Sequence, residues 1–237
     1  MRQRSMISKV SILSVLLLSA CSSSTPDTGA SVQIFENHFS IQGKVTNSTV
    51  EQLENLVADY PEVTELHISS ETSDPMAAMQ LGYILYRNAF DLRVTDICKQ
   101  GCANYIFTAA KTRTVDEGAI VAWAGGALEQ SRLSEWTSTL FPGVGDFIAQ
   151  NANAYLRRET RFFNRINVDQ YITVYGFDKN IGCMTEQYQG FYYSEADLLS
   201  MGLGPSTFAE TDTSRVPNPR TDRYCQVDLS NRLLLIN

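Results

Sequence analysis

The sequence predicts a domain of the α/β class built on a parallel sheet. Short segments in which apolar and polar residues alternate, typical of strands, are separated by longer segments with apolar residues at helical spacing. That succession is typical of parallel βαβ units. With 237 residues, 43% of them hydrophobic and 19% charged, the chain can bury a sizeable core. This composition excludes a disordered chain, a collagen-like fibre and a coiled coil.

The regular pattern begins with two short strands and a helix. The strands are predicted by alternating apolar residues, Val32, Ile34, Phe39, Ile41 and Val45. A helix is expected over residues 46–60, where apolar side chains recur at helical spacing and Asn47 or Ser48 supplies the N-cap. A strand at residues 63–69 then leads into a polar turn.

The pattern continues with a second helix and two further strands. A helix is expected over residues 75–90, because Pro75 suits a first turn and apolar residues continue along the segment. A strand at residues 90–97, a helix at 101–110 and a short strand at 115–123 follow.

The first 20 residues have the features of an export signal. Three basic residues precede an apolar run at residues 10–18, which at about 1.5 Å per residue is too short to cross a bilayer core of about 30 Å. The cleavage region Leu18-Ser19-Ala20-Cys21 resembles a bacterial lipobox. That resemblance implies a lipid on Cys21, and Ser22 after it implies the outer membrane. The alternative is a soluble secreted protein with a chance cysteine.

We therefore expect a signal peptide at residues 1–20, a flexible tether at 21–31 and one domain at 32–237. The tether is rich in Ser, Thr, Pro and Gly. The domain would be held by its lipid at the periplasmic side of the cell envelope. The net charge is −7, and loss of the signal leaves 16 Lys and Arg against 26 Asp and Glu. Binding to nucleic acid is not expected at that charge.

Four cysteines remain after Cys21, namely Cys98, Cys102, Cys183 and Cys225. In the oxidising periplasm an even number is typical of disulfides. Three pairings are open, and closeness in sequence favours Cys98–Cys102 with Cys183–Cys225. A zinc site would need closer cysteines and neighbouring histidines, whereas His38 and His67 lie elsewhere in the sequence. Neither a metal nor a cofactor is expected.

Two later segments are rich in charged or aromatic residues. Residues 157–163 (RRETRFF) predict an amphipathic helix whose charges are solvated and paired along it. The aromatic residues at 188 and 191–193 predict packing or a subunit contact.

Several motifs between Ile41 and Trp123 resemble the Clp-protease/crotonase superfamily, especially its small periplasmic members. They are an opening Ile41-Gln42-Gly43-Lys44-Val45, a strand end Ile68-Ser69-Ser70 and the run Cys98-Lys99-Gln100-Gly101-Cys102-Ala103, which is similar to a Cys-x-Ser-x-Cys-Ala turn. A late segment at 191–199 resembles the start of the family's terminal helix. The resemblance implies a spiral of ββα units around a parallel sheet, and a homo-oligomer.

The chain departs from this family at its catalytic positions. Gln100 stands where the family has its nucleophilic Ser, and Ala124 where it has His. The Gly-Gly turn that supplies oxyanion donors falls on Thr72 and Ser73. An amide has no oxygen that a base can activate as a nucleophile. The resemblance therefore implies a degenerate active site.

The sequence predicts a lipid-anchored pseudo-hydrolase that binds a protein or peptide through its old cleft or an oligomer surface. The alternative is a divergent serine or cysteine peptidase or esterase with a rebuilt site. Its nucleophile would be Cys102 or a hydroxyl of Ser70, Thr72 or Ser73, and its base Lys99 or Lys111. A third hypothesis is an envelope scaffold without a specific ligand.

Overall fold

The computed structural model describes residues 29–130, 144–178, 181, 183, 187–209 and 221–229. The predicted signal peptide, Cys21 and most of the predicted tether lie outside the described residues.

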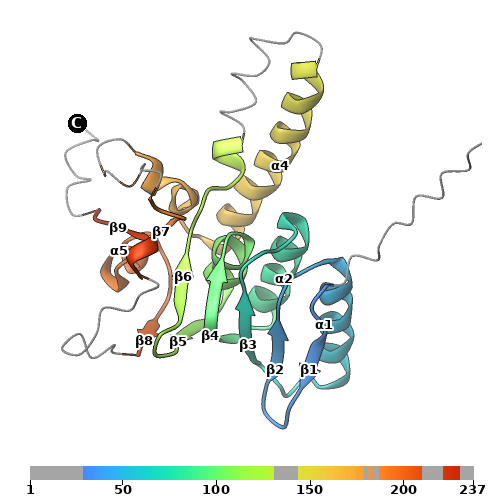
Figure 1. The fold of residues 1–237 in the computed structure, drawn as a ribbon. Helices are drawn as coiled ribbons and strands as arrows, with labels where there is room; N and C mark the ends of the chain where they lie inside the picture. The colour runs from blue at the N-terminus through green and yellow to red at the C-terminus, as the bar shows by residue number, and fades with distance from the viewer. Residues whose placement is uncertain are drawn as a thin grey trace, which may run out of the picture.

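A seven-stranded, mostly parallel sheet forms the centre of the molecule (Figure 1). Its strands are β1 (Val32–Ile34), β2 (Phe39–Gln42), β3 (Glu65–Ser70), β4 (Asp91–Lys99), β5 (Thr112–Val115), β6 (Ile120–Ala122) and β8 (Ser206–Phe208). They lie in the order β1-β2-β3-β4-β5-β8, with β6 also beside β4. Only the β1–β2 pair is antiparallel. The predicted α/β class with a parallel sheet is confirmed.

Strand β4 bends and pairs with two different strands along one edge. Its register against β3 shifts, so that Val94 lies opposite Ile68 but Cys98 lies opposite Ser70. Its first half pairs with β5 and its second half with β6. The single strand predicted at residues 115–123 is therefore wrong, because a turn at Asp116–Ala119 separates β5 from β6.

Helices pack on the sheet and follow the strands in the predicted alternation. They are α1 (Asn47–Asp59), α2 (Pro75–Arg87), η1 (Cys102–Phe107), α4 (Val144–Ile166) and α5 (Glu195–Ser200), with short 3₁₀ turns η2 (Gln170–Thr173), η3 (Tyr175–Phe177) and η4 (Thr221–Arg223). Thr46 is the N-cap of α1, so the prediction of Asn47 or Ser48 is wrong by one or two residues. Asp74 caps α2 by accepting from the N–H groups of Met76 and Ala77.

The main core lies where α1, α2 and η1 meet the sheet, and it includes Phe39, Ile41, Leu53, Ile68, Leu81, Leu85, Phe90 and Phe107, all fully buried. Helix α2 contacts α1 on one side and α4 on another (Figure 1). It approaches η1 so closely that a Cβ on Gly82 would overlap the Tyr105 carbonyl oxygen. Within the described parts of the chain, no helix has the length and apolar character of a bilayer span.

Both predicted disulfides are confirmed. Cys98 at the end of β4 is bonded to Cys102 at the start of η1, across a three-residue turn. Cys183 is bonded to Cys225 in β9 (Cys225–Val227), which pairs with β7 (Phe191–Tyr193) in a second, two-stranded sheet. The second bond therefore ties the segment at Cys183 to that small sheet.

Candidate functional site

The candidate site lies where three neighbouring parallel strands end. Strands β3, β4 and β6 run in the same direction, so their carboxyl ends reach one edge of the sheet. The loops that follow them carry Thr72 and Ser73, Gln100, and Ala124, respectively. The fold thus brings all four predicted site residues to the edge where ligands bind in open α/β sheets.

The turn at Gln100 is the most constrained part of this edge. Gln100 has φ = +53° and an exposed side chain, while the two disulfide-bonded cysteines around it are fully buried. Its carbonyl oxygen accepts from the N–H of Asn104 at 2.7 Å. A left-handed conformation costs a residue with a Cβ about 1–2 kcal/mol, so the disulfide and helix hold the turn against strain. Strained strand-to-helix turns expose the nucleophile in α/β-hydrolases, whereas the side chain at this turn is an amide.

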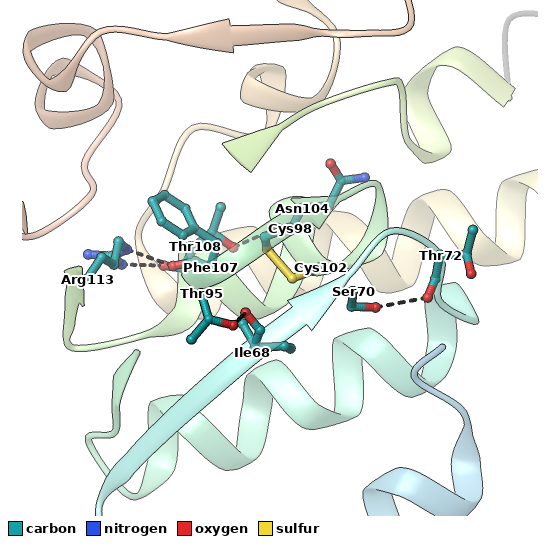
Figure 2. Close-up of a disulfide and its surroundings, with 10 residues drawn as sticks. All are labelled: Ile68, Ser70, Thr72, Thr95, Cys98, Cys102, Asn104, Phe107, Thr108 and Arg113. Atoms are coloured by element: carbon teal, nitrogen blue, oxygen red, sulfur yellow. Dashed lines mark hydrogen bonds between the residues drawn. A yellow bond between two sulfur atoms is a disulfide. The ribbon is translucent and has the colours of Figure 1, made fainter. Parts of the chain in front are cut away.

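Cys102 is not available as a nucleophile in this structure. Its sulfur is bonded to Cys98, and a disulfide sulfur has no thiolate to attack with. Figure 2 shows this bond beside Asn104, with Ser70 at the end of the neighbouring strand β3 and Thr72 on the loop that follows it. Cys102, which the sequence offered as an alternative nucleophile, therefore stabilises the Gln100 turn through its disulfide.

The hydroxyl groups after β3 have structural contacts. Ser70 donates to the Thr72 carbonyl oxygen at 2.9 Å (Figure 2). The Ser73 hydroxyl is buried against Gly101, where any Cβ would overlap it, and no described residue forms a hydrogen bond with it. Among the described residues no base lies within hydrogen-bond distance of either serine hydroxyl. A hydroxyl without a neighbouring base is a weak nucleophile.

The backbone after β3 is bonded to the segment that follows β2. The N–H of Asp74 donates to the Val45 carbonyl oxygen at 2.9 Å, and the N–H of Val45 donates to the Thr72 carbonyl oxygen. These bonds form an isolated parallel bridge between Val45 and Ser73, outside the named strands. Thr72 and Ser73, where the resemblance implied the oxyanion turn, are therefore held in place by this bridge.

The loop after β6 joins this edge through Asn104. The Asn104 side-chain amide donates to the Gly125 carbonyl oxygen at 2.8 Å, whereas its own oxygen is buried and has no partner among the described residues. Ala124, where the resemblance implied a His, has only a methyl group. One ionisable group beside this loop is Glu129, whose carboxylate lies against Gly125, and burial raises its pKa.

The other predicted bases lie away from these hydroxyls. The Lys99 amino group lies over the Tyr224 ring, 5.6 Å from its centre, and Lys111 is exposed. His38, in the loop before β2, stacks on His67 of β3, with 3.7 Å between the ring centres. His67 also forms a hydrogen bond with Glu65. In the described part of the chain no cluster of three or more potential ligands could hold a metal ion.

The prediction for residues 157–163 missed a buried carboxylate. Glu159 on α4 is fully buried rather than solvated. One of its oxygens accepts from the Tyr105 hydroxyl at 2.7 Å and the Ala127 N–H at 3.1 Å, and the other accepts from the Gln170 side chain at 2.8 Å. Phe162 and Phe163, three and four residues later, are the sequence signal that could have placed Glu159 on the buried face.

The Glu159 carboxylate affects the two tyrosines beside it. Tyr105 and Tyr155 share a hydrogen bond between their hydroxyl groups. Burial raises the pKa of both phenols, and the nearby negative charge of Glu159 raises both further. Both tyrosines therefore stay neutral at physiological pH and act as hydrogen-bond donors.

Comparison with known proteins finds similarity in structure only. No protein family and no curated protein matches the chain. A solved protein assigned as an enoyl-CoA hydratase from Streptomyces coelicolor A3(2) is 13% identical, with a TM-score of 0.31 over 46% of this chain, and the match spans about half (53%) of that protein's length. A ClpP1 variant from Listeria monocytogenes is 10% identical, with a TM-score of 0.31 over 49% of this chain and 78% of its own. The membrane-bound stomatin-specific protease 1510-N, as a variant, is 11% identical, with a TM-score of 0.42 over 84% of this chain and 96% of its own.

Substitution of Glu159 tests the buried network. Glu159→Leu leaves three donors unsatisfied, and we expect it to lower the free energy of unfolding by about 3–5 kcal/mol. Glu159→Gln keeps an acceptor for Tyr105 and Ala127 and should lower it by only about 1 kcal/mol. Urea denaturation measures the free energy of unfolding of both variants. The exposed Glu117→Gln is the control, and its free energy of unfolding should lie within about 0.5 kcal/mol of the wild type. Equal, small effects of both Glu159 substitutions would contradict the network.

Proposed function

We propose that this chain is a lipid-anchored protein of the periplasmic face of the cell envelope, with a ClpP/crotonase-like domain that binds a protein or peptide and does not hydrolyse it. The observation that carries the proposal is the Gln100 turn. It keeps the strained backbone of a nucleophile position, braced by the Cys98–Cys102 disulfide, but presents an amide.

The chemistry around the turn supports the absence of hydrolysis. Nucleophilic catalysis needs a hydroxyl or thiol, a base to activate it, and donors for the oxyanion. Cys102 is held in its disulfide, Ser70 donates to a backbone carbonyl, and no described base lies within hydrogen-bond distance of the Ser70 or Ser73 hydroxyl. In the described part of the chain the candidate nucleophiles are thus either used for structure or left without a base.

A binding role agrees with what the structure retains. The loops after β3, β4 and β6 are joined by the Asn104–Gly125 hydrogen bond, the Ser73–Gly101 contact and the disulfide. Rigid loops on a parallel sheet are suited to presenting a fixed surface, because little conformational entropy is lost on binding. Self-association, which the sequence resemblance implies, belongs to the same proposal.

Covalent probes test the catalytic part without knowledge of the substrate. A fluorophosphonate labels an activated serine, and iodoacetamide labels a reactive thiolate. We expect no fluorophosphonate labelling at the candidate site, with or without reductant, because neither Ser70 nor Ser73 has a described base beside its hydroxyl. Iodoacetamide should label Cys102 only after reduction, because the disulfide protects it.

Matched variants locate any labelling that does occur. Ser73→Ala and Ser70→Ala identify a serine nucleophile, and Cys102→Ala identifies a thiol. Fluorophosphonate labelling that disappears in Ser73→Ala, or thiol labelling at Cys102 without reductant, would contradict the proposal. Either result would instead indicate the divergent peptidase or esterase.

The lipid anchor is tested at Cys21, which precedes the described residues. We expect the wild-type chain to incorporate radiolabelled palmitate and to sediment with outer membranes, because two or three acyl chains hold a protein on a bilayer. Cys21→Ser should remove the label, whereas the neighbouring Ser22→Ala should keep it. An unlabelled wild-type chain recovered in the soluble periplasmic fraction would contradict the anchor.

A further inference from the structure

A groove runs along the outer side of α2, away from the Gln100 turn. It consists of two adjoining cavities of about 470 and 640 Å³ that share Gln80 and Tyr83 in their walls. Met76, Met79 and Tyr83 line the floor of its first part. From Met76 to Arg87 this floor spans about 16 Å, the length of about three helical turns. We call this feature the α2 groove.

The wall of the α2 groove formed by α4 is strongly basic. Arg158 and Arg161 line the first cavity and Arg165 lines the second. Together with Arg157 they fall within an arc of about 100° on the helix, at 100° per residue. Their side chains are exposed. Among the described residues none of the four forms an ion pair with a carboxylate.

The opposite wall has the reverse charge. Glu51 and Glu54 of α1 line the second cavity, and Glu54 makes only a long, exposed contact of 3.8 Å with Arg87. The large side chain of Tyr86, 41% exposed, also lines this cavity. The groove therefore combines an apolar, methionine-containing floor with one basic and one acidic wall.

We propose that the α2 groove binds an acidic, amphipathic peptide segment of a partner protein. Carboxylates of the segment pair with Arg158, Arg161 and Arg165, and its apolar side chains pack on Met76, Met79 and Tyr83. Methionine suits such a floor because its flexible side chain adapts to different apolar partners. This site lies outside the candidate catalytic edge, so it stands whether or not that edge proves catalytic.

Charge complementarity favours a peptide over a membrane surface. The chain as a whole is acidic, with a net charge of −7, yet four guanidinium groups without a described carboxylate partner gather on one helix. At a screening length of about 8 Å, a ligand in the groove interacts more strongly with these nearby charges than with acidic residues far from the groove. An anionic bilayer would also meet Glu51 and Glu54 in the same groove, whereas a peptide can place different side chains along the two walls.

The test uses the full chain in dodecylmaltoside micelles and a fluorescein-labelled peptide of about 12 residues, long enough to span the groove as a helix. The peptide carries Glu at every fourth position and Leu on the adjacent face. We expect saturable binding, seen by fluorescence anisotropy, that weakens at high salt. Arg158→Gln/Arg161→Gln should weaken it about tenfold or more. A matched peptide with Gln for Glu should bind as weakly to the wild type.

Arg157→Gln is the matched control, because Arg157 has the same charge on the same helix but does not line the groove. It should bind the peptide like the wild type. Equal weakening by Arg157→Gln would overturn the proposal, as would the absence of binding by the wild type. Displacement of the peptide by micelles doped with phosphatidylglycerol would assign the arginines to an anionic membrane instead. If the chain forms oligomers that dissociate in Arg158→Gln/Arg161→Gln, the arginines would instead be assigned to a contact with a second copy of this chain.

Discussion

The buried Glu159 carboxylate is the interaction on which most of the molecule's arrangement depends. Its donors come from three separate segments, namely Tyr105 in η1, Ala127 after β6, and Gln170 in η2. A carboxylate buried without a cation is tolerated only when its hydrogen bonds are satisfied. The network therefore fixes α4 against the core, and with it the loop of the candidate site and the basic wall of the α2 groove. One charge thus holds both surfaces in place.

The candidate site and the α2 groove differ in how their polar groups are used. At the site, Cys102, Ser70 and the Asp74 N–H have structural partners, whereas the buried Ser73 hydroxyl has none among the described residues. In the groove, the guanidinium groups of α4 stay exposed and without described carboxylate partners. Unpaired charges around an apolar floor are typical of a surface that meets a partner.

The sequence predicted the fold well where signals were local. Alternation and helical spacing placed β3, α1 and α2 within a few residues, and spacing in an oxidising compartment indicated both disulfides. The break between β5 and β6 was missed, although the polar run Asp116-Glu117-Gly118, with Gly118 at φ = +75°, is typical of a turn. Glu159 also escaped, because its donors lie 11 to 54 residues away in the chain. The convergence of residues 72, 100 and 124 required the family resemblance, since it depends on strand order rather than local pattern.

The α2 groove is proposed as a contact with a partner that needs no chemistry at the Gln100 turn. Photo-cross-linking in intact cells tests this, with a benzophenone amino acid placed at Gln80 or at Gln100. Both positions are exposed, so neither substitution disturbs the core. We expect cross-linked adducts from position 80, lost when Arg158 and Arg161 are replaced by Gln, whether or not the loop at position 100 also forms adducts. Adducts from position 100 with none from position 80 would contradict the α2 groove as the contact.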